Sequence, residues 1–139
     1  MDVQDDLSTY QGRLKTFTES WPFSKGKLTR QEMAKAGFFY LKGDCVQCYY
    51  CEKELDCWEE EDDAFVEHKN HAAYCPFVKM FSEPPNSVTV HQAIELEKDK
   101  LLLSLDRSFE KWLKDIKEVN EQGISKFSKE IKKIRKLRL

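Results

Sequence analysis

The sequence predicts an α+β protein, in which a small domain with a three-stranded antiparallel sheet and short helices is followed by one long C-terminal α-helix. Three observations support this class. Residues 38–57 contain short strand-like segments separated by turn residues. Residues 48–75 contain cysteines and a histidine at metal-ligand spacing. Residues 89–137 contain no proline and carry apolar residues at heptad spacing.

The first predicted element is a helix over about residues 10–21. Ser8 or Thr9 can cap its N-terminus, and Pro22 ends it. Its apolar residues recur at steps of four, three and four, which places them on one helix face: Tyr10, Leu14, Phe17 and Trp21. We interpret this stripe as part of the core.

A capping box formed by Thr29 and Glu32 opens a second, short helix that extends to about residue 36. Gly37 follows in the usual helix-ending position. The strands of the sheet are predicted at residues 38–41, 46–50 and about 54–57. A third short helix is predicted from about residue 64 to residue 72, after an acidic run.

The most specific motif is Cys48-x-x-Cys51, followed after sixteen residues by His68 and after six more by Cys75. Thiolate sulfur and neutral imidazole are preferred Zn²⁺ ligands, and Cys₃His is a usual structural set. Four protein ligands leave no open position for an activated water. We therefore expect one structural Zn²⁺ and no catalysis at this site.

Other interpretations of the cysteines exist. Cys45 stands three residues before Cys48, so these two could be the ligand pair instead. A redox Cys-x-x-Cys would normally open a helix after a strand, whereas aromatic neighbours favour a strand and a turn here. A disulfide framework suits secreted chains, but residues 1–6 are acidic and lack an apolar signal region. Cys45 and Cys57 are interpreted as ordinary reduced thiols.

Composition separates the chain into two parts. Residues 1–80 hold 15 acidic and 10 basic residues, and residues 81–139 hold 10 acidic and 13 basic residues. The acidic first part argues against general nucleic-acid binding there and suits a cationic partner. A domain of about 80 residues buries a modest core, which a bound metal would supplement. No apolar run is long enough to span a membrane.

Pro84 and Pro85 mark the boundary of the domain. The predicted organisation is a zinc-binding domain over 1–81, a linker over 82–88, and a long amphipathic coiled-coil helix over 89–139. The helix carries an apolar stripe: Leu105, Phe109, Trp112, Ile116, Val119, Phe127, Ile131 and Ile134. The eight-residue step that contains Gly123 indicates a local change of supercoil or a hinge. The stripe requires partner helices, from a second copy or from other proteins.

Residues 126–138 contain seven basic residues and one acidic residue. This tail could contact nucleic acid, microtubules or an acidic partner, or act as a nuclear-import signal. It could equally be the solvated face of a coiled coil.

A series of separated motifs extends over about residues 8–80. In chain order they are Arg13-Leu14-x-Thr16-Phe17, Trp21-Pro22, Met33-Ala34-x-Ala36-Gly37-Phe38, Asp44-x-Val46-x-Cys48-x-x-Cys51, Leu55-x-x-Trp58-Glu59, Asp62-Asp63, Glu67-His68 and Cys75-x-Phe77-Val78. Together they resemble the baculovirus IAP repeat (BIR) family. The resemblance assigns Cys48, Cys51, His68 and Cys75 as the zinc ligands. A single BIR domain followed by a long helix is similar to the survivin-type branch of the family.

The resemblance implies a peptide-binding groove beside the third strand, in which a peptide with a free N-terminus adds a further strand. Leu55 and Trp58 would form a small apolar pocket for an N-terminal alanine, and Asp56 and Asp62 would hold its ammonium group. The alternative is that Leu55 and Trp58 belong to the core and the acids are merely solvated. We favour the groove, because a tryptophan exposed among five acidic neighbours would be costly without a use.

Lys53 and His71 match the positions that the resemblance assigns to a phosphate on the third peptide residue. An ammonium group and a protonatable imidazole can both donate hydrogen bonds to phosphate. Glu54 would face a following lysine or arginine of the peptide.

The survivin-type resemblance implies a non-enzymatic adaptor of the chromosomal passenger complex in mitosis. Its groove would read the phosphorylated N-terminal tail of a histone, and its helix would bundle with a helical scaffold and a further subunit that together bring a mitotic kinase. The expected location is nucleus and cytoplasm, with centromeres and spindle midzone in mitosis. A homodimer would use Phe81, Val88 and Val90, although Pro84-Pro85 departs from the expected pattern.

The alternative function is an apoptosis inhibitor that binds caspases or the N-termini of their antagonists. The long helix favours the adaptor, because caspase binding gives no reason for about fifty residues of coiled coil. A ubiquitin-ligase RING is excluded, because it needs about eight Cys/His ligands beyond those of the BIR domain. The chain has only five cysteines and three histidines.

Overall fold

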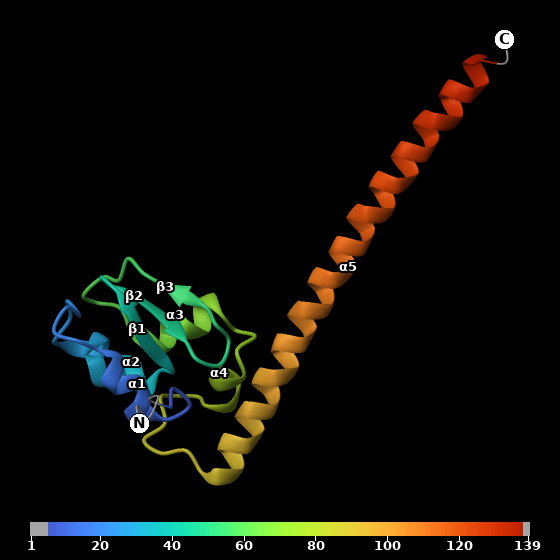
Figure 1. The fold of residues 1–139 in the computed structure, drawn as a ribbon. Helices are drawn as coiled ribbons and strands as arrows, with labels where there is room; N and C mark the ends of the chain where they lie inside the picture. Colours follow the sequence, from blue (N-terminus) through green and yellow to red (C-terminus); the bar gives the residue numbers. More distant parts are fainter. Residues whose placement is uncertain (1–5, 138–139) are drawn as a thin grey trace, which may run out of the picture. The chain divides into compact units, whose positions relative to one another are not determined.

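The computed structural model describes residues 6–137, and Figure 1 shows a sheet with short helices followed by one long helix. The chain divides into two compact units between Lys100 and Leu101. The expected α+β class is confirmed. Its elements are α1 (Tyr10–Thr16), a 3₁₀ turn η1 (Gly26–Leu28), α2 (Arg30–Lys35), β1 (Phe38–Lys42), β2 (Cys45–Cys48), β3 (Glu54–Leu55), α3 (Ala64–His71), α4 (Pro76–Met80) and α5 (Val90–Leu137).

The sheet is antiparallel with the order β1-β2-β3, so β3 is an edge strand. Phe38 of β1 pairs with Cys48 of β2, and Val46 of β2 pairs with Leu55 of β3, so the three predicted strands form one antiparallel sheet. The third strand is shorter than predicted. At Cys57 the backbone takes the left-handed conformation, with φ of 57°, so the chain turns away from β2 soon after β3 ends.

The first helix is also shorter than predicted, because α1 ends at Thr16 instead of continuing to Trp21. The Thr16 hydroxyl accepts a hydrogen bond from the Tyr40 amide at 2.8 Å, which ties the end of α1 to β1. Phe17 and Trp21 are still buried, and their rings meet edge-on at 5.4 Å. The stripe is therefore only partly core: Phe17 and Trp21 are buried but lie outside the helix, whereas Tyr10 and Leu14 on α1 are half-buried.

The capping predictions agree with the structure. Thr9 caps α1, and the Thr29 hydroxyl accepts the Glu32 amide at the start of α2. After α2, Gly37 has a φ of 95°, and an added Cβ would lie 3.3 Å from the Phe77 ring. Two elements, η1 and α4, were not predicted from the sequence, and they are only three and five residues long.

The core of the first unit lies between the sheet and the short helices, and α1 and α2 both pack against β1 (Figure 1). Its fully buried members include residues from distant parts of the chain: Leu28, Met33, Phe38, Phe77 and Leu96. Leu96 belongs to α5, so the first turns of the long helix complete the core of this unit.

Polar contacts accompany the packing of Leu96. The Tyr49 hydroxyl donates to Glu97 Oε1 at 2.9 Å, and Lys100 Nζ lies 3.4 Å from the centroid of the Tyr49 ring. The helix itself begins with a reciprocal cap, in which the Gln92 amide donates to the Thr89 hydroxyl and the Thr89 amide donates to Gln92 Oε1.

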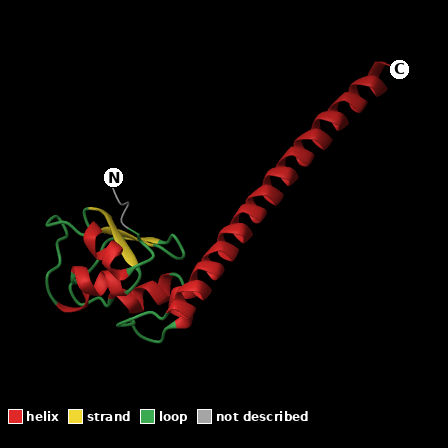
Figure 2. Cartoon of the chain, turned by 60° about the horizontal axis from the view of Figure 1, so that its bottom comes forward, coloured by secondary structure: helices red, strands yellow, loops and turns green. Residues whose placement is uncertain are grey.

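From Leu101 onward, α5 is a single unbroken helix to Leu137, seen as one continuous coil in Figure 2. The local change expected at Gly123 does not interrupt it, and the position of that glycine is open, with no atom within 4 Å of an added Cβ. None of the described helices combines the length and apolar character needed to cross a bilayer.

Candidate metal centre and peptide groove

Cys48, Cys51, His68 and Cys75 come together at one buried point, with all their ligand atoms within 4.8 Å of one another. Ligands around a tetrahedral Zn²⁺ at the usual bond lengths lie about 3.8 Å apart for two sulfurs and about 3.5 Å apart for sulfur and nitrogen. The Cys48 and Cys75 Sγ atoms are 3.8 Å apart, and Cys51 Sγ lies 3.5 Å from His68 Nε2. The four residues therefore fit one structural Zn²⁺.

The surroundings orient His68 and Cys48 for this role. His68 Nδ1 lies 2.8 Å from the Ala36 carbonyl oxygen, and a hydrogen bond donated there leaves Nε2 free as a metal ligand. The Tyr50 amide donates to Cys48 Sγ at 3.3 Å. These contacts come from Ala36, next to α2, and Tyr50, after β2, so neighbouring backbone groups fix the directions of the two ligands.

The thiols of the cluster differ in their protonation. Hydrogen bonds from Cys48 and Cys75 hold the pKa of Cys51 well below its ordinary value. Burial raises the pKa of Cys48 well above its ordinary value. Uptake of Zn²⁺ must therefore remove protons from the cluster.

Cys45 and Cys57 are free thiols, as expected, and neither belongs to the metal cluster. Burial raises the pKa of Cys45, and the neighbouring Asp56 raises that of the exposed Cys57. Both changes favour the neutral thiol. The choice of Cys48–Cys51 over Cys45–Cys48 as the ligand pair agrees with the structure.

The predicted groove residues lie on and after the edge strand. Glu54 and Leu55 form β3, where Glu54 is exposed and Leu55 is half-buried, and Asp56 follows as an exposed residue. Lys53 is half-buried immediately before the strand.

The expectation that Trp58 is exposed is wrong, because its side chain is only 8% exposed. It packs edge-on against Phe38 with ring centroids 6.0 Å apart. Its backbone amide is held by the Asp44 carboxylate at 3.3 Å, while its indole N–H is buried without a hydrogen-bond partner in the described part of the chain. Trp58 thus contributes to the core. An exposed tryptophan therefore does not mark the groove, and the feature that remains is the edge strand β3.

Asp62, predicted to hold a peptide ammonium group, accepts a hydrogen bond from the Glu59 amide at 2.8 Å through one carboxylate oxygen, Oδ2. This contact fixes the turn before α3. The hydrogen bond that Asp44 accepts from the Trp58 amide was not predicted from the sequence. The only indication of a role for Asp44 was its position in the motif at the start of β2.

His71 lies at the end of α3 with a side chain that is 54% exposed. Its Nε2 atom lies 3.3 Å from Glu67 Oε2, one helical turn earlier, and the other oxygen of Glu67 accepts a hydrogen bond from Asn70 at 3.3 Å. The predicted phosphate ligand is therefore paired with an anion of its own chain. Spacing of i, i+4 could have revealed this pair.

The residues predicted for dimer formation differ in exposure. Phe81 is half-buried and meets Phe77 edge-on at 5.2 Å, whereas Val88 and Val90 are exposed. Their role stays a prediction.

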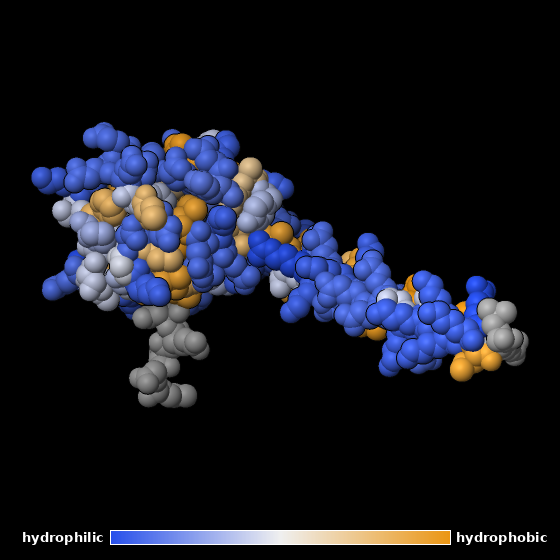
Figure 3. All heavy atoms as spheres, turned by 90° about the horizontal axis from the view of Figure 1, so that it is seen from above, coloured by the Kyte–Doolittle hydropathy of each residue, from blue (hydrophilic) through white to orange (hydrophobic). Residues whose placement is uncertain are grey.

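Most of the apolar stripe on α5 is exposed, and Figure 3 shows orange apolar side chains at intervals along the helix. Ile131 alone among the predicted stripe residues is half-buried. The exposed set extends further toward the N-terminus than predicted, to Leu101 and Ile94, seven residues apart. The heptad spacing could have revealed Leu102 instead, which is also exposed and stands three residues before Leu105, in the alternation of three and four.

Comparison with known proteins agrees with this fold and metal site. Residues 13–79 match the family model of the BIR, described as an Inhibitor of Apoptosis domain. Baculoviral IAP repeat-containing protein 5.1 of Xenopus tropicalis is 37% identical over 101 residues, which cover 69% of this chain and 62% of that protein. Baculoviral IAP repeat-containing protein 5 of Cavia porcellus is 33% identical over 125 residues, which cover 79% of this chain and 84% of that protein.

Solved structures are similar as well. The crystal structure of DIAP1 BIR1 bound to a Grim peptide is 33% identical and superposes with a TM-score of 0.50, over 67% of this chain and 91% of that one. The chain therefore belongs to the BIR family of inhibitor-of-apoptosis proteins. Within it, the chain is of the survivin type, and its BIR domain binds one structural zinc ion.

Proposed function

We propose that this protein is a non-enzymatic adaptor of the chromosomal passenger complex in mitosis. Its BIR groove reads the phosphothreonine-bearing N-terminal tail of a histone, and α5 bundles with a helical scaffold and a further subunit. The complex carries a mitotic kinase, so the protein supplies location and assembly, at centromeres and the spindle midzone. Between divisions it is distributed over nucleus and cytoplasm.

The observation that carries the peptide-binding role is the free edge of β3. This strand pairs with β2 on one side and has no strand on the other within residues 6–137. An incoming peptide can pair with this edge through main-chain hydrogen bonds, while side chains select its sequence. In this proposal, Leu55 contributes to the pocket for the N-terminal alanine, and Asp56 and Asp62 hold its ammonium group. Lys53 and His71 bind the phosphate.

The exposed stripe of α5 supports the assembly role. Stripe residues from Leu105 to Ile134 present large apolar side chains to solvent, which an isolated helix cannot bury. Partner helices in a coiled-coil bundle would cover them. A homodimer through Phe81, Val88 and Val90 would be a second state of the same protein.

The alternative is an apoptosis inhibitor that binds caspases or the N-termini of their antagonists. The specific observation in its favour is that the related DIAP1 BIR1 was solved with a Grim peptide. The same edge strand could serve either role, so the ligand must decide between them.

Calorimetric titration of the zinc-loaded chain with alanine-starting histone-tail peptides decides this question. The peptides carry threonine at position three, with and without phosphate. The adaptor predicts tighter binding of the phosphopeptide, and loss of this preference in Lys53→Ala and His71→Ala. Equal binding of the two peptides would contradict the phosphate-reading role and favour the apoptotic ligands.

A further inference from the structure

The last quarter of α5 differs in charge from the rest of the helix. Residues 101–123 hold four basic and five acidic residues, whereas residues 124–137 hold six basic and one acidic residue. The second segment therefore has a net charge of +5. All of its residues except Ile131 are exposed.

The basic residues are not spread evenly around the helix. Four of them recur at steps of three, four and three, which places them in one row along a helix: Lys126, Lys129, Lys133 and Lys136. At 3.6 residues per turn this row lies roughly opposite the apolar residues Phe127, Ile131 and Ile134. We call the four residues the lysine row.

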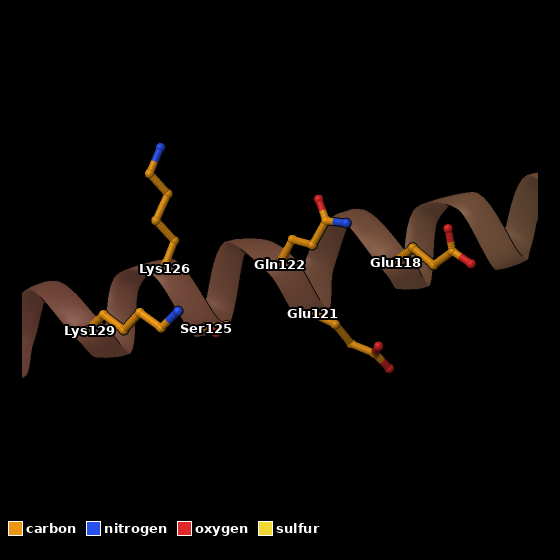
Figure 4. A pocket seen from close by; sticks show the side chains of 6 residues that line it. All are labelled: Glu118, Glu121, Gln122, Ser125, Lys126 and Lys129. Atoms are coloured by element: carbon orange, nitrogen blue, oxygen red, sulfur yellow. The ribbon is translucent and has the colours of Figure 1, made fainter.

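Figure 4 shows how this side of the helix changes along its length. Glu118, Gln122, Ser125 and Lys129 line one shallow hollow on the surface of α5, and the acidic side chains give way to Lys126 and Lys129. The hollow is formed by a single helix, so it is an open surface and no enclosed site. None of the lysines of the row lies in an ion pair with another described residue.

We propose that the lysine row is a binding surface for the phosphate backbone of double-stranded nucleic acid. The row is about 15 Å long at 1.5 Å per residue. A duplex presents one phosphate per about 3.4 Å of each strand, so about four phosphates of one strand lie along this length. Four unpaired ammonium groups therefore match the charge and the extent of one stretch of duplex backbone.

The position of the row favours nucleic acid over a membrane. A basic helix on a bilayer inserts its apolar face, and here that face carries the continuation of the coiled-coil stripe. The row points away from that face, so a polyanion can bind it while Phe127, Ile131 and Ile134 remain packed against partner helices. The inference goes beyond the peptide-reading function and does not depend on it.

The test uses the zinc-loaded full chain and a fluorescent duplex of arbitrary sequence, with affinity measured at several salt concentrations. A row variant replaces all four lysines by glutamine, which retains helix propensity. A matched control replaces four exposed lysines of the first unit by glutamine: Lys25, Lys27, Lys42 and Lys79. Circular dichroism checks that both variants keep their helix.

The row variant should bind about tenfold or more weakly near 0.1 M salt, and its slope of log affinity against log salt should fall by up to about 3.6. The control should stay within about twofold of the parent chain. Equal loss in both variants, or no loss in the row variant, would overturn the proposal. Stronger binding of tubulin or anionic vesicles than of duplex at equal salt would overturn it as well.

Discussion

At the scale of single residues, Cys57 occupies a backbone conformation that favours glycine, with φ of 57°. A non-glycine residue there costs about 1–2 kcal/mol, and glycine loses about 0.5–1 kcal/mol of that advantage through unfolded-state entropy. Cys57→Gly should therefore raise the free energy of unfolding by about 0.5–1 kcal/mol, measured by denaturant titration of the zinc-loaded chain. Cys57→Ala removes the same thiol but keeps the strain, so it should bring no gain. Equal effects of the two variants would contradict the strain account.

The Glu67–His71 pair leads to a second prediction, which rests on the proposed phosphate site. A phosphate of about −1.5 to −2 charges must approach an imidazole that already has a carboxylate 3.3 Å away. Glu67→Gln removes this repulsion, so the affinity for the phosphopeptide should rise by about threefold to fivefold. The gain is limited to about 1 kcal/mol or less because solvent screens these partly exposed charges. Calorimetry of both peptides measures it, and the unphosphorylated peptide should be unaffected.

Glu19→Gln provides a control with the same charge change. Glu19 follows α1, which packs on β1 at the opposite edge of the sheet from β3. Zinc content is measured for each variant, because Glu67 neighbours His68 in the sequence. A weaker phosphopeptide affinity in Glu67→Gln with full zinc content would show that the carboxylate assists the site.

At the scale of elements, local signals predicted the structure where local chemistry decides it. The Thr29–Glu32 cap and Gly37 fixed the ends of α2 correctly, because a side-chain cap and a positive φ depend on adjacent residues. The end of α1 could not be predicted, because the bond between Thr16 and Tyr40 joins residues 24 positions apart. The apolar periodicity alone predicted that α1 continues to Trp21. In the structure Trp21 follows a turn after the end of α1 and still packs in the core.

The start of α5 supplies a prediction at the same scale. Leu96 is 1% exposed in the core of the first unit, whereas Ile94, two residues earlier, is 60% exposed. Leu96→Ala should lower the free energy of unfolding of the zinc-loaded domain by about 2–5 kcal/mol, because it leaves a cavity. Ile94→Ala is the matched control and should change it by less than about 1 kcal/mol. Thermal denaturation followed by near-UV circular dichroism compares them. Similar losses would show that α5 does not complete the core.

At the scale of the whole molecule, the metal site was the most predictable feature. Thiolate and imidazole spacing limits the ligands to a small set, and the resemblance to the BIR family selected the set that the structure brings together. The groove was less predictable. Exposure of Trp58 depends on its packing against Phe38, which no local pattern records.

Removal of the metal tests how far the zinc site holds the first unit together. The ligands come from β2 and its following turn, α3, and the N-terminus of α4, so Zn²⁺ joins segments that a small core holds weakly. A strong chelator should unfold the BIR domain, seen as loss of near-UV signal and of sheet. Helical signal from the second unit should be less affected. A chelated sample that keeps its sheet and near-UV signal would contradict this account.

We propose that the free edge of β3 receives a peptide by its free N-terminus. The most direct measurement compares, by calorimetry, one phosphothreonine histone-tail peptide with a free N-terminal alanine and the same peptide N-acetylated. Acetylation removes the ammonium charge that Asp56 and Asp62 are proposed to hold. We predict a loss of affinity of about tenfold or more, which corresponds to about 1.4 kcal/mol or more. Equal affinity for both peptides would contradict the claim, because the groove would then not recognise a free N-terminus.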